Sequence, residues 1–255
     1  MDTFLLLVLA IVVGSAISLA SGALLFLTTK KRQRAVALAL PFGAGVLLGA
    51  AFFDLLPESV EHGDAHELLG WALLGFLVFF LLERLSSWFH HHHEHTAKER
   101  REQQNRLVIT GDLLHNIIDG AAIGAAFLVN PVTGFITTIA VSAHEIPKEL
   151  GTFGILLSRG WKDRKVILAN IATALGTLAA ASLVFWLGHR VQLPEAEMLA
   201  ITAGFFIYVA ASDIIPEIHE QPRRLGTLQA IILVASVALV AIAIALMGDL
   251  HTHVL

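Results

Sequence analysis

The sequence predicts an all-α integral membrane protein with eight transmembrane helices. Of its 255 residues, 56% are hydrophobic and 15% are charged, whereas soluble domains carry about 25% charged residues. Apolar segments of about 20 residues, the length that crosses a bilayer, recur along the whole chain. Lys and Arg gather in alternate connections between these segments, which is typical of a chain that crosses a membrane several times.

The connections are too short to hold a soluble domain, so we expect one transmembrane domain over residues 1–255. No basic residue precedes the first segment and no cleavage-site pattern follows it, so we interpret it as a retained span rather than a signal peptide. The predicted spans cover residues 4–27, 36–57, 68–88, 107–129, 134–157, 167–188, 197–217 and 228–248.

The basic residues predict the orientation of the spans. The first, third, fifth and seventh connections are rich in Lys or Arg, whereas the others contain Arg190 alone. Because basic connections stay in the cytoplasm, we expect both termini outside. The net charge of −4 is mild and gives no indication of a nucleic-acid partner. We expect a multi-pass protein of the cell membrane, in contact with the lipid bilayer, and we favour a bacterial inner membrane.

The third connection, residues 89–106, is polar and rich in histidine, so we expect a flexible cytoplasmic loop. The histidine run is internal and interrupted by Glu94, which argues against an expression tag. The loop is either a labile metal reservoir, which we favour, or a polar linker. Its candidate metal-binding residues are His90, His91, His92, His93 and His95.

One acidic pattern ends two of the spans. D-L-L-P-E at 54–58 ends span 2, and D-I-I-P-E at 213–217 ends span 7, at opposite membrane faces in the predicted topology. Inverted repeats in transporters produce such pairs. We therefore expect spans 1–3 and 6–8 to be related around spans 4 and 5. The alternative is a common helix-ending pattern, because proline stops helices.

Ionisable residues lie in the middle of spans 4 and 5, where they are costly and by default mark a site or a pathway. In both spans the polar residues fall at positions i, i+1 and i+4, which share one side of a helix. A short connection at 130–133 makes the two spans antiparallel neighbours, so their polar sides can meet at one depth. These residues are His115, Asn116 and Asp119 in span 4, and His144, Glu145 and Lys148 in span 5.

These side chains offer ligands for a divalent cation. Imidazole nitrogen and carboxylate oxygen are ligands for zinc, and the chain has no cysteine, which excludes thiolate ligands and thiol catalysis. Zinc, iron and manganese suit such ligands better than copper(I). Acidic and histidine residues near the two membrane faces are candidates for an entrance and an exit. They are Asp54, Glu58, Asp112, Asp213, Glu217 and His219.

The motifs H-N-I-I-D-G at 115–120 and H-E-I-P-K-E-L-G at 144–151 resemble those of the ZIP (Zrt/Irt-like) family of divalent metal transporters. The resemblance covers essentially the whole chain. It implies uptake of Zn²⁺, or of Fe²⁺, Mn²⁺ or Cd²⁺, into the cytoplasm by a homodimer, with no cofactor. It also implies that His115, Asp119 and His144 are the principal ligands. Asn116 and Glu145 then belong to an adjoining second site.

Lys148 departs from the family pattern, which places a metal-binding His or Glu at this position. In the interpretation that we favour, its ammonium pairs with Glu145 or Asp119 where the second metal would lie, and the site holds one metal. In the other interpretation, desolvated Lys148 loses its proton and couples transport to pH. Span 6 offers only Thr173 where some members supply another carboxylate, which also puts a two-metal site in doubt.

An intramembrane zinc-dependent hydrolase is the alternative from another class. His144-Glu145 begins like H-E-x-x-H, in which two histidines bind zinc and the glutamate is the general base. Here Lys148 replaces the second histidine and Pro147 lies within the motif, so the peptidase geometry fails. We therefore expect a transporter without catalytic residues. A hydrolase that uses the same His/Asp/Glu cluster remains the alternative.

Overall fold

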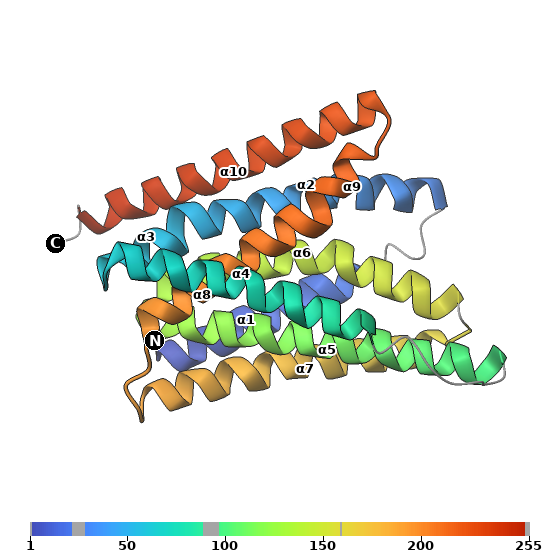
Figure 1. Cartoon of the computed structure of the whole chain (residues 1–255), viewed down its shortest axis with the longest axis horizontal. Coiled ribbons are helices and arrows are strands. Elements are labelled where there is room, and N and C mark those ends of the chain that lie inside the picture. The colour runs from blue at the N-terminus through green and yellow to red at the C-terminus, as the bar shows by residue number, and fades with distance from the viewer. Residues whose placement is uncertain (1, 22–28, 89–96, 159, 253–255) are drawn as a thin grey trace.

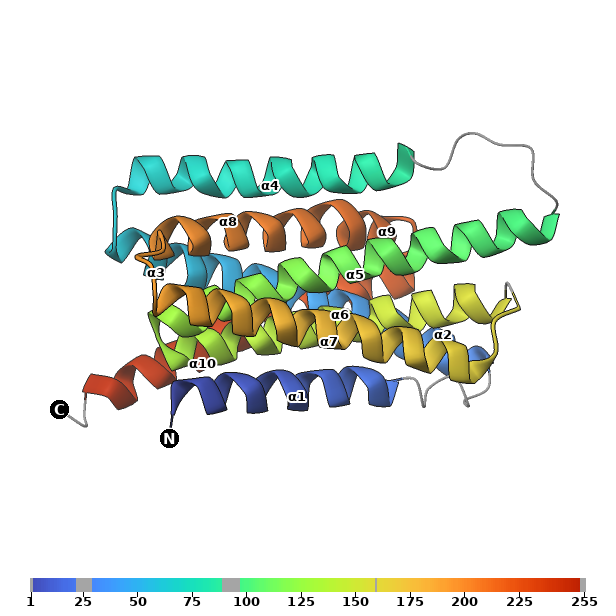
Figure 2. The same ribbon diagram turned by 90° about the horizontal axis from the view of Figure 1, so that it is seen from below.

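The computed structural model describes residues 2–21, 29–88, 97–158 and 160–252, and these residues form a bundle of helices (Figures 1 and 2). Two of the long helices are continued through a π-helical turn, at Ala51–Leu55 and at Val209–Ile214. The helices are α1 (Thr3–Ser21), α2 (Thr29–Ala50), α3 (Leu56–Glu61), α4 (Ala65–Trp88), α5 (Ala97–Val129), α6 (Pro131–Ser158), α7 (Asp163–Gly188), α8 (Glu195–Tyr208), α9 (Ile215–His219) and α10 (Arg223–Thr252).

The all-α class predicted from the sequence is confirmed for the described residues. Among the described residues, seven helical segments are long and apolar enough to cross a membrane. The helix α6 is not among these seven, although its 28 residues exceed the length of a span. It carries Glu145, Lys148 and Glu149 within its length, and these charges lower its hydropathy. The eight-span layout therefore stays a prediction.

The helix α5 begins before the predicted span 4, within the segment 89–106 that we expected to be a loop. This helix begins at Ala97 rather than at residue 107, so residues 97–106 of the predicted loop are helical. Their sequence, A-K-E-R-R-E-Q-Q-N-R, consists largely of good helix formers but is too polar to be recognised as part of a span. Residues 89–96, which include the five loop histidines, lie outside the described part of the chain.

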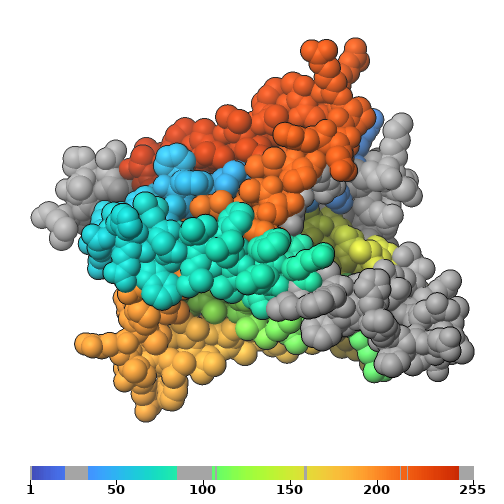
Figure 3. Space-filling model, in the orientation of Figure 1, coloured from blue at the N-terminus to red at the C-terminus, as the bar shows by residue number. Residues whose placement is uncertain are grey.

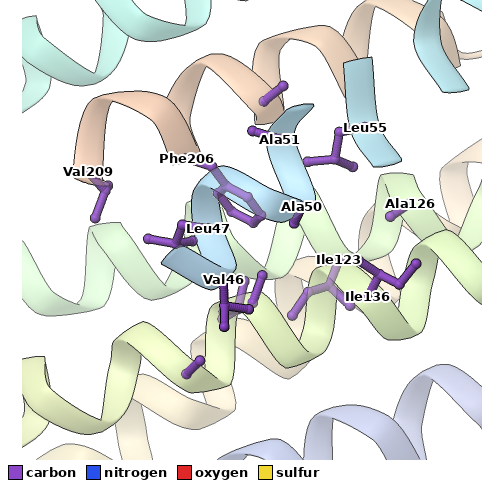
Figure 4. Packing of buried hydrophobic residues seen from close by; sticks show 14 of the residues in the cluster. Val46, Leu47, Ala50, Ala51, Leu55, Ile123, Ala126, Ile136, Phe206 and Val209 are labelled. Atoms are coloured by element: carbon purple, nitrogen blue, oxygen red, sulfur yellow. The ribbon is translucent and has the colours of Figure 1, made fainter. Parts of the chain in front are cut away.

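The apolar core lies between α2, α5, α6 and α8. Leu47 of α2 and Phe206 of α8 are buried there, together with Ile123 of α5 and Ile136 of α6 (Figure 4). The outer surface is also apolar, as expected for helices in contact with lipid. On α4 the exposed residues recur at Leu69, Leu73, Leu77 and Leu81, and Figure 3 shows α4 and α10 at the surface of the bundle.

Glycines allow two helix pairs to pack with their backbones close together. A Cβ atom on Gly120 of α5 would lie 2.2 Å from the carbonyl oxygen of Thr177 on α7. On α8, a Cβ atom on Gly204 would lie 2.0 Å from the carbonyl oxygen of Ala72 on α4. These contacts fix the depth of α5 relative to α7 and of α4 relative to α8.

The two D-x-x-P-E segments share a backbone irregularity. Each overlaps a π-helical turn, closed by a hydrogen bond from Leu56 N–H to the Ala51 carbonyl and from Ile215 N–H to the Ala210 carbonyl. Pro57 and Pro216 then follow these donors and offer no N–H of their own. The two segments thus have the same backbone geometry, and the inverted-repeat organisation stays a prediction. The structure does not describe the side chains of Asp213 and Glu217.

The helices α5 and α6 are antiparallel neighbours joined by Asn130 (Figure 1). Asn130 caps α6, because its Oδ1 accepts a hydrogen bond of 2.8 Å from the Thr133 N–H. Figure 1 also shows that α1 begins and α10 ends at the same end of the bundle, while the α6–α7 and α9–α10 connections lie at the other end. This arrangement agrees with an even number of crossings.

Candidate metal centre

Two histidines and two carboxylates from α5 and α6 converge in the interior of the bundle. One ligand atom from each of His115, Asp119, His144 and Glu145 lies within 4.8 Å of all the others. The Nε2 atoms of the two histidines are 3.2 Å apart. The Asp119 Oδ2 lies 3.5 Å from each of these nitrogens. Imidazole nitrogens and carboxylate oxygens at such separations can close around a single divalent cation.

The helical spacing explains why these side chains meet. His115 and Asp119 are four residues apart, which places them on one face of α5. On α6, the His144 Nδ1 lies 3.2 Å from the Ala140 carbonyl oxygen. When Nδ1 carries the proton it donates to this oxygen, and Nε2 is left free to bind a metal.

Aromatic side chains from α4 and α8 cover the histidines. Phe79 of α4 meets the His115 ring edge to face, with centroids 5.2 Å apart. Phe206 of α8 lies beside His144 at 6.5 Å. Asp119, His144 and Glu145 are buried, with relative exposures of 3–5%. A buried set of two carboxylates is costly unless positive charge compensates it, and a bound cation would supply that charge.

Asn116 lies beside this cluster and is held by its neighbours. Its Nδ2 donates to the Asp112 carbonyl (3.0 Å) and is 3.4 Å from the Glu145 Oε2. Its Oδ1 accepts a hydrogen bond of 2.8 Å from the Thr177 hydroxyl of α7. The span 6 residue at this site is therefore Thr177. Thr173, which the sequence suggested, instead donates to the Asn170 carbonyl on its own helix.

The Lys148 ammonium contacts two carboxylates. Its Nζ lies 2.5 Å from the Glu145 Oε1 and 3.0 Å from the Asp112 Oδ1. The expected pairing with Glu145 is therefore present. Within the described residues the second partner is Asp112 of α5 rather than Asp119, and Asp112 precedes His115 by three residues on that helix. An ammonium has no lone pair for a metal, so Lys148 contributes charge to the site and no ligand.

The predicted entrance and exit residues do not all lie near the metal centre. Asp54 is buried, and its Oδ1 accepts a hydrogen bond of 3.3 Å from the Thr133 hydroxyl. Glu58 accepts one of 3.0 Å from the Asn130 side chain. Both therefore contact the turn between α5 and α6. Asp112 joins the cluster through Lys148, and His219 is exposed at the end of α9.

This fold and this site define a class: a polytopic α-helical membrane protein with a buried His/carboxylate cluster that can hold a divalent cation. The model of the family described as "ZIP Zinc transporter" matches residues 4–107 and 105–244. The chain belongs to the ZIP zinc transporter family.

Relatives named as zinc transporters match large parts of the chain. Zinc transporter zipt-7.2 of Caenorhabditis elegans is 32% identical over 250 residues, covering 75% of this chain and 54% of the relative. Zinc transporter ZIP13 of Pongo abelii is 31% identical over 225 residues, covering 82% of this chain and 67% of the relative. Zinc transporter ZIP4 of Homo sapiens is 41% identical over 110 residues, covering 43% of this chain and 17% of the relative.

The chain thus spans about half the length of zipt-7.2 and a smaller part of ZIP4. The names of the relatives agree with metal transport and do not favour the hydrolase alternative. These relatives are animal proteins, so the expected bacterial inner membrane remains a prediction.

Proposed function

We propose that this protein transports a divalent metal cation, with zinc as the main substrate, through the site on α5 and α6. The observation that carries the proposal is the convergence of two imidazoles and two carboxylates within 4.8 Å, buried between helices of membrane-spanning length. The principal ligands are His115, Asp119 and His144. Glu145 can join them, and Asn116 lies where it can orient Glu145 or complete the shell.

The site holds one metal ion in this proposal. Lys148 supports it, because its positive charge lies against the Glu145 carboxylate on the side toward Asp112. A second divalent cation at that place would be repelled by the ammonium. Neutral Thr177, rather than a carboxylate, faces Asn116 from α7.

The pathway in this proposal runs from outside to the cytoplasm through eight spans, with both termini outside. Asp54 and Glu58 form the outer approach, and Asp112 and His219, together with Asp213 and Glu217, form the inner route. Acidic groups at a mouth raise the local cation concentration. The protein acts in the cell membrane as a homodimer, requires no cofactor, and also admits Fe²⁺, Mn²⁺ or Cd²⁺. The five loop histidines at 90–95 serve as a cytoplasmic metal reservoir.

Metal flux into proteoliposomes tests the proposal. Vesicles with the wild-type protein are expected to accumulate Zn²⁺, reported by an internal fluorescent indicator, and His144→Ala should abolish the accumulation by removing a principal ligand. His189→Ala is the matched control, because His189 lies at the end of α7 and contacts Phe185. Equal flux through wild-type and His144→Ala protein would overturn the proposal. Substrate hydrolysis without flux would favour the hydrolase.

A further inference from the structure

A further buried carboxylate, Glu149, lies next to the metal centre and is not among its ligands. Glu149 follows Lys148 on α6 and is 5% exposed. Successive residues on a helix point about 100° apart, and the Lys148 ammonium is directed at Glu145 and Asp112. The nearest cation on the same helix is thus already paired with other acids, and Glu149 has no positive partner among the recorded ion pairs of the described residues.

Polar side chains of two other helices face this carboxylate. Ser18 of α1 and Asn170 of α7 both lie close to the Glu149 carboxylate, and they are 4% and 2% exposed. In the described part of the chain, no well-aligned hydrogen bond is recorded for the Ser18 Oγ, the Glu149 Oε2 or the Asn170 Oδ1. Buried oxygens without partners are costly, and here three of them are gathered between three helices.

A small cavity opens beside the Ser18 and Glu149 side chains, and Asn170 lies outside its lining. Its volume is about 30 Å³, which is room for about one or two water-sized species. Ser18 and Glu149 line it, together with Asn116, Glu145 and Thr177. The polar groups in this lining are hydroxyls, carboxylates and one amide, without imidazole or thiol. Oxygen ligands of this kind favour hard cations over zinc, which prefers nitrogen and sulfur.

The charges of the lining favour a monovalent cation. Lys148 contacts Glu145 and Asp112, whereas no described ion pair gives Glu149 a positive partner, so Glu149 is the carboxylate left for the ion. We propose that Ser18, Glu149 and Asn170 form a binding site for an alkali cation, with Na⁺ as the occupant, separate from the divalent metal centre. The ion satisfies the three oxygens that lack partners and neutralises the buried carboxylate.

Direct Na⁺ binding tests the site without relying on metal transport. Purified full-length protein in lipid nanodiscs, with a chelator present to keep the divalent centre empty, is titrated with ²²Na⁺ at neutral pH. Saturable binding is expected for the wild type. Glu149→Gln should weaken it by about tenfold or more, because it removes the ligand charge. Ser18→Ala and Asn170→Ala each remove one neutral oxygen and should weaken binding to a smaller extent.

Asp163→Asn is the matched control, since Asp163 is an exposed acid on the first turn of α7, and its Na⁺ binding should equal that of the wild type. Size-exclusion profiles and Zn²⁺ binding show whether each variant is folded. If Glu149→Gln does not fold, Asn170→Ala tests the site with the carboxylate still in place. No saturable Na⁺ binding to the wild type would overturn the proposal and leave a protonated Glu149 as the explanation. Equal binding by folded Glu149→Gln and wild type would also overturn it.

Discussion

The Lys148 ammonium lies 2.5 Å from the Glu145 Oε1, the same oxygen that faces both histidines of the metal centre. This oxygen is 3.6 Å from the His144 Nε2 and 3.8 Å from the His115 Nε2. One carboxylate oxygen is therefore shared between a fixed positive charge and the place where a metal would bind. Lys148 thus limits how much negative charge Glu145 can offer to a metal.

Replacing Lys148 with histidine should create a second metal position. The imidazole would add a ligand beside Glu145 and Asp112 and remove the repulsive charge, so metal stoichiometry should rise from about one ion per chain to about two. Elemental analysis of the purified protein after dialysis against Zn²⁺ measures this ratio.

Lys148→Gln removes the charge without adding a strong ligand, and Lys162→Gln neutralises an exposed lysine between α6 and α7. Neither control should gain a second ion. Unchanged stoichiometry together with an unchanged metal preference in Lys148→His would contradict the one-metal explanation.

Replacing Gly120 with alanine should destabilise the contact between α5 and α7. The added methyl group would lie 2.2 Å from the Thr177 carbonyl oxygen, and such overpacking costs about 1–3 kcal/mol. Because Asp119 precedes Gly120, displacement of α5 should also weaken Zn²⁺ binding. Thermal unfolding in detergent and a Zn²⁺ titration measure the two effects.

Gly111→Ala provides the comparison on the same helix. No atom of another element lies within 4 Å of the added Cβ at this position among the described residues, and alanine is the better helix former by about 1 kcal/mol. This variant should be as stable as the wild type or more stable. A Gly120→Ala variant as stable as Gly111→Ala would disprove the close α5–α7 contact.

Replacing Asn130 with alanine should loosen the turn between α5 and α6. The change removes the cap on the Thr133 N–H and the hydrogen bond to Glu58, and caps contribute about 1 kcal/mol. Asn130→Ser keeps an oxygen that can cap the helix but loses the Glu58 contact. Stability in denaturant should decrease from wild type to serine to alanine, and identical midpoints for all three would contradict the capping role.

Single cysteines should report the number of crossings. The chain has no cysteine, so Asp64→Cys before α4, Lys162→Cys after α6 and Gln192→Cys after α7 give unique labels. A membrane-impermeant maleimide should label positions 64 and 192 in intact cells, and position 162 only after permeabilisation. Labelling of position 162 from outside would mean that α6 does not cross.

Much of the arrangement could be predicted from the sequence, because its signals are local. Hydropathy locates the spans. The i, i+1, i+4 spacing places His115 and Asp119 on one face of α5 and His144 on one face of α6, and these faces meet when the two helices are antiparallel. The polar start of α5 was missed because hydropathy does not report helices outside the lipid. Its helix-forming composition was the signal that could have located it.

Contacts between distant helices could not be predicted in this way. Thr177 reaches Asn116 only because Gly120 lets α7 approach α5, and Phe79 covers His115 only because α4 packs on α8. No motif marks these residues. Glu149 gave a partial signal, since a second acid four residues after Glu145 shares its side of α6. Its partners Ser18 and Asn170 depend on the packing of three helices.

The polar content of α6 also bears on how the protein enters a membrane in the eight-span arrangement. Each charged residue at the centre of a helix costs about 2.5–3.5 kcal/mol during insertion by the translocon, and α6 carries three. Lys148 of α6 pairs with Asp112 of α5. A single residue separates these two helices in the chain. We therefore expect α5 and α6 to insert together as a helical hairpin. The ligands on α5 and α6 would then come together as the hairpin forms, and α7 and α8 would complete the site through Thr177 and Phe206.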